Sequence, residues 1–289
     1  VAYEWTAAPN SRNMHRNVIF KDSKKVPAIP FTAIDSQYPN DLWNWMDGQR
    51  KAGNELLAIS HNANLSDGIM FPVDEDYKGR PIAEDEFLPY MRAIDAAWAQ
   101  QRMLNEPLTE IIQIKGASET HPALSPNDEF ADFQLMSFLL GTPDSTSRVN
   151  GSYVRQAYQH GLGMQQARGY NPYKMGVVGA SDSHNTVISY TASNFFGQHG
   201  GMDASAKIRM EAQVESGMAT LLTGTSGLGG VWAEQNTRES IFAAMQRRET
   251  YGTSGVRIKV RMFGGGDFKP DVLKLKDWVA AGYALGPLL

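Results

Sequence analysis

The short motif with the clearest chemical meaning is an aspartate and a histidine two residues apart, Asp182 and His184. They follow residues 175–181, an apolar run with two valines that predicts a short buried strand. Side chains two apart on a strand share a face, and α/β proteins bind ligands at the carboxyl ends of their strands. A carboxylate beside an imidazole suits zinc, manganese or iron. The pair therefore predicts a metal site, although a capping aspartate and a hydrogen-bonded histidine would give the same pattern.

Three further metal-capable residues stand at or near the ends of other predicted strands. Glu4 lies between two aromatic residues, where a carboxylate is costly to bury without a cation or hydrogen-bond donors. His15 precedes one predicted strand and His61 ends another. If the strands are parallel, their ends meet at one edge of the sheet. Histidine and carboxylate ligands without thiolates are typical of hydrolytic sites with two or three metal ions.

Each of these residues, taken alone, also has a purely structural interpretation. Glu4 could pair with an arginine, His15 could cap a turn, and His61 could bond to a backbone carbonyl. The hypothesis of a metal site therefore depends on their coincidence at strand ends.

Four other residues are candidates for substrate binding. Lys115 and Arg257 could hold an anionic group, lysine as a point charge and arginine in a bidentate manner, although a solvated surface cation is an equal alternative for each. Glu119 and His121 follow a predicted strand and could contact the substrate or orient the metal ligands.

Strand-like and helix-like segments alternate along the chain, which predicts an α/β fold with a mostly parallel sheet covered by helices. A one-sided strand is also predicted where basic and apolar residues alternate, over residues 256–263. The other predicted strands cover residues 1–6, 17–21, 55–60, 110–114 and 175–181, and the predicted helices cover residues 41–52, 83–104, 127–140, 152–166, 204–216 and 237–248.

Composition excludes several classes of protein. The net charge of −4 gives no basic surface for nucleic acid, and the absence of cysteine rules out disulfides and cysteine-ligated metals. No apolar stretch is long enough to span a membrane. The chain starts inside a predicted strand, which predicts that it is the C-terminal part of a longer polypeptide and is compatible with a periplasmic or exported protein. Oligomeric state leaves no interpretable signal.

The order of the motifs resembles the PHP (polymerase and histidinol phosphatase) superfamily, in particular a PHP-related bacterial family of unknown function. The PHP pattern has a strand glutamate, a histidine opening an H-x-N-V strand, a strand-terminal S-H-N/P and a D-x-H. Here these motifs are matched by Glu4, His15, His61 and the pair Asp182 and His184. Residues 110–119 and 250–258 also look typical of the subfamily.

The resemblance implies a distorted (β/α)7 barrel, with mostly parallel strands and helices outside, forming one metal-dependent hydrolase domain over residues 1–289. It implies two or three divalent ions bridged by Glu4, with Asp182 and His184 holding one or two ions and His15 and His61 completing the set. The family's H-x-H pair does not occur in the sequence. The resemblance therefore implies that N-terminal strands of the domain precede Val1.

The predicted function is that of a metal-dependent hydrolase, most simply a phosphoesterase that attacks a small anionic substrate with a metal-activated water. Glu4, Asp182 and His184 would be its catalytic residues. Zinc, manganese and iron all fit the ligand types. Two alternatives stay open: hydrolysis of a non-phosphate bond, such as an amide or sulfate ester, and a degenerate barrel that binds a ligand without catalysis.

Overall fold

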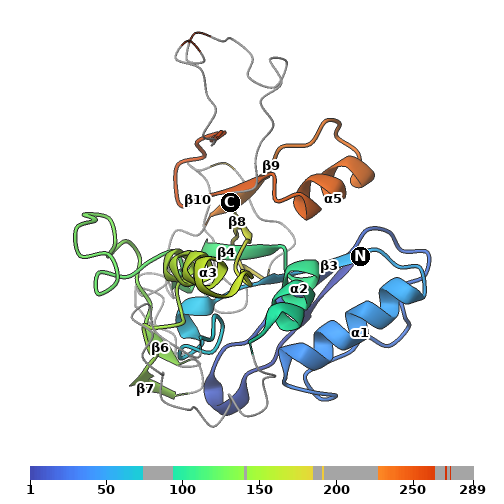
Figure 1. Cartoon of the computed structure of the whole chain (residues 1–289), viewed down its shortest axis with the longest axis horizontal. Helices are drawn as coiled ribbons and strands as arrows, with labels where there is room; N and C mark the ends of the chain where they lie inside the picture. The colour runs from blue at the N-terminus through green and yellow to red at the C-terminus, as the bar shows by residue number, and fades with distance from the viewer. Residues whose placement is uncertain are drawn as a thin grey trace, which may run out of the picture.

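The computed structural model of the chain describes residues 1–73, 94–139, 142–184, 191, 227–263, 271 and 274, and every structural statement below concerns these residues. Figure 1 shows the arrangement of their helices and strands.

A six-stranded mixed sheet forms the centre of the described fold, in the order β1-β2-β3-β4-β5 with β8 also paired to β4. The pairs β1–β2, β2–β3 and β4–β5 are antiparallel, whereas β3–β4 and β4–β8 are parallel. The strands are β1 (Ala2–Trp5), β2 (Arg16–Phe20), β3 (Leu56–Ser60), β4 (Leu108–Gln113), β5 (Gly116–Ala117) and β8 (Gly176–Gly179).

Two small hairpins and four helices surround this sheet in the part of the chain that the structure describes. The helices are α1 (Pro39–Lys51), α2 (Ala96–Asn105), α3 (Val154–Arg168) and α5 (Arg238–Gln246), and the short 3-10 turns are η1 (Pro9–Ser11) and η2 (Ala63–Leu65). The hairpins are β6 (Phe138–Leu139) with β7 (Thr142–Thr146), and β9 (Leu228–Val231) with β10 (Thr250–Thr253).

The prediction of a (β/α)7 barrel with mostly parallel strands is wrong. The described sheet is mixed, and its strands do not close into a barrel. The error begins at the first connection, because residues 6–15 join β1 directly to its neighbour β2. Parallel neighbours need a crossover of a dozen or more residues, usually a helix, so this short connection leaves the antiparallel arrangement.

Two other predicted elements are also wrong. Residues 127–139 form turns that lead into β6 instead of a helix, because the Asp128 side chain accepts a hydrogen bond from the Phe130 backbone and favours a local turn. Residues 256–263 are irregular, and the strand of that region is β10. Helix α2 starts at Ala96, capped by Asp95, which accepts from the Trp98 backbone at 2.8 Å. Of the predicted helices, residues 83–93 and 204–216 lie outside the described residues.

The core lies between the first three strands and the helices α1 and α2, which run side by side in Figure 1. Trp5 and Val18 of the sheet are fully buried, as is Trp43 of α1. Trp43 meets Trp98 of α2 edge-on, with ring centroids 5.5 Å apart. Large aromatic side chains thus fix α1 and α2 against the part of the sheet that carries Glu4.

A buried ion network crosses this core. Arg16 Nε donates to Glu106 Oε1 at 2.8 Å, Arg102 Nη2 lies 3.4 Å from Glu106 Oε2, and Trp43 Nε1 also donates to the carboxylate. All three charged side chains are at most 1% exposed. Burial alone would raise the pKa of Glu106, but the two guanidinium groups outweigh it and hold that pKa below its ordinary value. The network joins β2 to the segment between α2 and β4.

The hairpin β9–β10 packs on β8 with almost no space between the backbones. Thr250 Oγ1 donates to the Val177 carbonyl and the Gly227 amide donates to the Ala180 carbonyl, each at 2.8 Å. A Cβ atom on Gly252 would lie 2.7 Å from the Gly179 nitrogen, closer than real Cβ contacts allow. The close approach therefore requires glycine at position 252.

Replacing Glu106 by glutamine is expected to destabilise the fold by about 3–5 kcal/mol, because two buried guanidinium groups lose their counter-charge. The free energy of unfolding in urea measures this loss. Glu55→Gln, which removes an exposed partner of Lys21, is the control and is expected to have little effect. Equal losses in the two variants would contradict the role assigned to the network.

The Glu106 carboxylate also makes the stability of the fold depend on pH, in a direction that its lowered pKa defines. The folded-state pKa of Glu106 lies below the ordinary value of 4.5. The ionised carboxylate therefore contributes fully to the free energy of unfolding above pH 4.5, and this contribution is lost as the pH falls further. The stability gap between the native chain and Glu106→Gln should therefore narrow below about pH 4.5. Urea unfolding at a series of acid pH values tests this, and a constant gap would count against it.

Gly252→Ala is expected to destabilise the fold by about 1–3 kcal/mol through overpacking against β8. The matched control is Gly163→Ala on the exposed side of α3, where nothing lies within 4 Å of the added Cβ. That change should stabilise the helix by about 0.5–1 kcal/mol. Thermal unfolding of both variants measures the difference, and a shift of the same sign in both would refute the packing argument.

Candidate metal centre

All five predicted metal ligands lie at one edge of the sheet. Strands β1, β3, β4 and β8 run in one direction and β2 runs in the other. The register pairs Trp5 with Arg16 and Arg16 with Ser60, so the ends of β1 and β3 meet the start of β2. The predicted ligands therefore converge, although not all of them follow parallel strands. The antiparallel strand β2 brings His15 to this edge at its beginning.

Glu4, His15 and His61 form the first group of potential ligands, and their ligand atoms lie within 4.8 Å of one another. His15 Nδ1 is 2.8 Å from Glu4 Oε1, and His61 Nε2 is 3.4 Å from the same oxygen. The two imidazole rings meet edge-on with centroids 5.5 Å apart. His61 is buried, and its Nε2 has no hydrogen-bond partner among the described residues. A buried, unsatisfied ring nitrogen aimed at a carboxylate is suited to a metal ion.

Glu4, Asp182 and His184 form a second group with the same spread of ligand atoms. His184 Nε2 lies 3.2 Å from Asp182 Oδ1, and Lys115 Nζ forms an ion pair with Asp182 Oδ2. Glu4 belongs to both groups. Its carboxylate has two oxygens and stands between the histidine pair and the Asp182 side of the cluster, which is the position of a shared ligand.

Asp182 and His184 do not share the face of a strand, contrary to the prediction. They follow β8 in left-handed backbone conformations, with φ of +50° and +46°. Asn62, next to His61, has φ of +55°. Left-handed non-glycine residues cost about 1–3 kcal/mol each and gather at functional sites. Hydrogen bonds to the strand end, such as the Ala180 amide to the Ile112 carbonyl at 2.9 Å, hold the Asp182 turn in place.

Two polar residues of β4 support the centre. The Gln113 amide nitrogen lies 3.5 Å from His61 Nδ1, and Glu110 Oε1 accepts from the Asn62 backbone at 3.3 Å. Gln113 thus contacts the ring nitrogen of His61 that faces away from Glu4. Neither residue is among the predicted site residues, although Glu110, a carboxylate inside an apolar strand, carries the same signal that singled out Glu4.

Burial and charge set the protonation states of the centre. Burial alone would raise the pKa of Glu4, but the nearby imidazoles of His15 and His61 outweigh it and lower that pKa. Burial lowers the pKa of His61 to about 4, so its imidazole is neutral at physiological pH. Burial also lowers the pKa of Lys115 to about 8 and raises that of Glu110 to about 8. An ionised carboxylate beside a neutral imidazole is the form that binds metals.

Of the four predicted substrate residues, Lys115 contacts one of the ligand groups directly. Lys115 is nearly buried and contacts Asp182. Glu119 is half-exposed and pairs with Arg155 at 2.5 Å, while His121 Nδ1 accepts from the Ala123 backbone. Arg257 donates to Thr253 Oγ1 at 3.4 Å. None of these three belongs to either ligand group.

Comparison with known proteins yields one match. Residues 1–288 match the family model described as "Protein of unknown function (DUF3604)". The chain belongs to the DUF3604 family. The resemblance to the PHP superfamily is wrong, because no PHP family model matches and the mixed, open sheet differs from a PHP barrel. No curated protein and no solved structure matches this DUF3604 chain. Among its described residues, no helix has the length and apolar character needed to cross a membrane.

In this DUF3604 protein, His61→Ala is expected to weaken binding of Mn²⁺ or Zn²⁺ at least about tenfold, since loss of even an outer support of a metal ligand costs that much. His15→Ala should act similarly. Calorimetric titration with each metal, after treatment with a chelator, measures the affinity. His121→Ala is the control, because His121 lies outside both groups. Unchanged affinity in the His61 and His15 variants would refute the first ligand group.

Proposed function

We propose that this protein is a metal-dependent hydrolase whose metal centre comprises Glu4, His15, His61, Asp182 and His184. The observation that carries the proposal is the pair of three-residue ligand groups that share Glu4. Two groups with a common carboxylate fit a pair of divalent ions bridged by that carboxylate.

The donor set favours a transition metal over magnesium or calcium. Each group combines imidazole nitrogen with carboxylate oxygen, which suits zinc, manganese and iron, whereas the hard cations prefer oxygen alone. When bound, such an ion would lower the pKa of a coordinated water towards neutrality and polarise the bond to be broken. Glu4 and Asp182 would supply the negative charge of the centre, and the neutral His61 ring would supply a lone pair without an added charge.

The position of Lys115 favours a substrate with a negative charge. Its ammonium group lies beside Asp182, at the border of the second ligand group. A substrate oxyanion arriving at the centre would meet this cation together with the metals, and a lysine there acts as a point charge for phosphate. Phosphoesters therefore fit this arrangement better than neutral amides do. The Lys115 side chain is 8% exposed, so its charge is only weakly screened by solvent.

The side chains of the proposed centre differ in their exposure to solvent. His61 and Lys115 are nearly buried, whereas the His184 side chain is 57% exposed. Glu4, at 28%, lies between these extremes. The gradient from buried to exposed side chains supports an approach of the substrate from the side of the Asp182–His184 turn.

Hydrolysis of chromogenic esters tests the proposed function. With added Mn²⁺ or Zn²⁺, the protein is expected to hydrolyse p-nitrophenyl phosphate or bis(p-nitrophenyl) phosphate, and a chelator should abolish the activity until metal is restored. Glu4→Gln should lower kcat/KM at least about 100-fold, because it removes the shared ligand. Activity only on p-nitrophenyl sulfate or an amino acid p-nitroanilide would replace the phosphoesterase assignment with a non-phosphate hydrolase.

The double variant Asp182→Ala with His184→Ala is expected to lose metal and hydrolysis while keeping its fold. Both side chains lie in a turn after β8, outside the hydrophobic core. Elemental analysis of the purified protein and circular dichroism measure the two properties, with His121→Ala again as the control. A double variant with full metal content and full turnover would refute the assignment of these ligands.

A further inference from the structure

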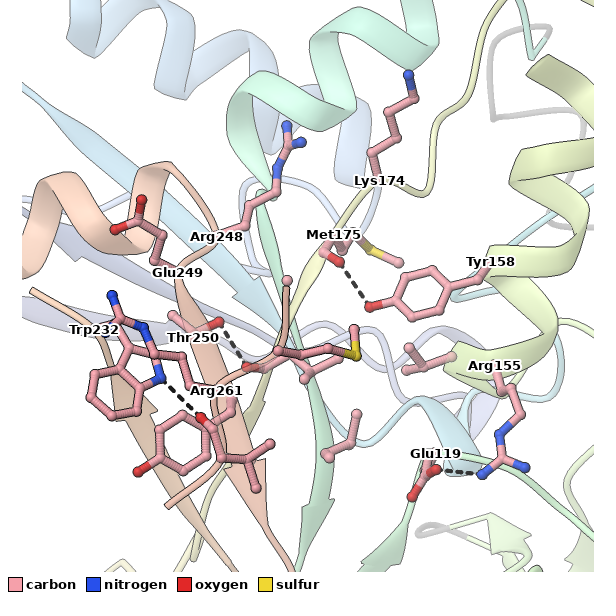
Figure 2. Close-up of a pocket in the computed structure, with 18 residues that line it drawn as sticks. Glu119, Arg155, Tyr158, Lys174, Met175, Trp232, Arg248, Glu249, Thr250 and Arg261 are labelled. Carbon is pink, nitrogen blue, oxygen red and sulfur yellow. Dashed lines mark hydrogen bonds and ion pairs between the residues drawn. The ribbon is translucent and has the colours of Figure 1, made fainter. Parts of the chain in front are cut away.

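A cavity lined by none of the candidate metal ligands lies between α3, the strands β8 and β10, and residues 260–262 (Figure 2). Its volume is about 660 Å³, which is within the range of small-molecule sites in proteins. None of the five proposed metal ligands lines it. The inference drawn from this cavity is therefore independent of the proposed hydrolase function.

Aromatic and aliphatic side chains form most of the wall, among them Ile111, Tyr158, Val177, Trp232 and Tyr251. The Trp232 and Tyr251 rings lie at 34° to each other with centroids 6.0 Å apart. Trp232 Nε1 donates to the Val260 carbonyl and Tyr158 OH donates to the Met175 carbonyl, as the dashed lines in Figure 2 show. The polar ends of both residues are satisfied by backbone, which leaves apolar ring surface for a ligand.

The same cavity has more cations than carboxylates. Arg155, Lys174, Arg248 and Arg261 line it, against Glu119 and Glu249. Both carboxylates are already paired: Glu119 with Arg155 at 2.5 Å, and Glu249 with Arg247, which lies outside the lining, at 2.8 Å. Lys174 and Arg248 form no ion pair with a carboxylate among the described residues. Figure 2 shows both side chains extending towards the top of the view, from opposite sides.

Arg248 carries one further mark of a ligand-binding residue. Its Nε is buried and has no hydrogen-bond partner in the described part of the chain, which is costly for a charged group. Its backbone is left-handed, with φ of +67°, because it follows the last turn of α5, where the Glu249 amide donates to the Ala244 carbonyl and closes the helix end. Arg261 lies over the Trp232 ring, with its guanidinium carbon 4.9 Å from the ring centroid, and so covers one face of that ring.

We propose that this cavity is a binding site for an aromatic organic anion, such as an aryl carboxylate or sulfonate. The acid group pairs with Arg248 and Lys174, and the ring packs against Trp232 and Tyr251. Inorganic phosphate alone would leave the apolar wall in water, and a neutral hydrocarbon would leave the Arg248 guanidinium unpaired. The combination of charge and apolar surface selects a molecule that has both.

Fluorescence titration with anilinonaphthalene sulfonate tests the site, because this probe is an aromatic sulfonate whose emission rises in apolar surroundings. The native protein is expected to bind one equivalent saturably. Arg248→Met and Trp232→Ala should each weaken binding at least about tenfold, whereas Arg248→Lys, which retains the charge, should lose less than Arg248→Met. Lys51→Met, an exposed cation on α1, is the control and should leave binding unchanged.

Three outcomes would overturn the proposal: no saturable binding by the native protein, several weak equivalents, or equal affinity in Arg248→Met and the native protein. Near-ultraviolet circular dichroism of each variant separates loss of the site from loss of the fold, since partly unfolded proteins bind the probe at many places. Titration after chelator treatment separates the two proposals. Binding that persists without metal supports this site whether or not the hydrolase assay succeeds.

Discussion

The buried ion pair between Arg16 and Glu106 connects the core to the candidate metal centre. Arg16 is the residue after His15, and its guanidinium also donates to the Met14 carbonyl on the other side of that histidine. Glu106 stands just before β4, the strand that carries Glu110 and Gln113. A charge pair with almost no exposure has one satisfactory geometry, because any displacement leaves a charge in an apolar surrounding. The pair thereby fixes the start of β2 relative to β4, and with it the position of His15.

The rest of the centre depends on how the sheet changes direction. The antiparallel strand β2 brings its beginning to the edge where β1 and β3 end, and the parallel pairings of β4 add the ends of β4 and β8. Glu4 can therefore meet both histidines and the Asp182 turn at once. Three left-handed residues at this edge show that the backbone is held in costly conformations where the ligands are presented. The packed core supplies the stability that offsets this strain.

The strands β4 and β8 serve both proposed sites. Glu110 of β4 faces the centre through its contact with Asn62, while its neighbour Ile111 lines the cavity beside α3. On β8, Val177 lines the cavity, and Asp182 follows the strand end. The tight packing of β9–β10 on β8, through Gly252, brings Trp232, Arg248 and Tyr251 to the cavity. The strands β4 and β8 thus lie between the candidate metal centre and the apolar, cationic cavity.

The sequence by itself determined the local features of this protein. Apolar runs and helix-end signals located β1 to β4, β8, α1, α3 and α5, because such signals depend on near neighbours in the chain. The residue types of Glu4, His15, His61, Asp182 and His184 marked the candidate ligands in the same way. Only the tertiary structure decided the direction of β2, the left-handed turn of Asp182, the contact of Lys115 with that residue, and the contacts of Glu110 and Gln113 with the His61 segment. Strand direction and register depend on contacts between segments distant in sequence, as between Arg16 and Glu106, and no local pattern encodes them. The family resemblance failed for the same reason: short motifs in a familiar order do not specify how the strands between them pair.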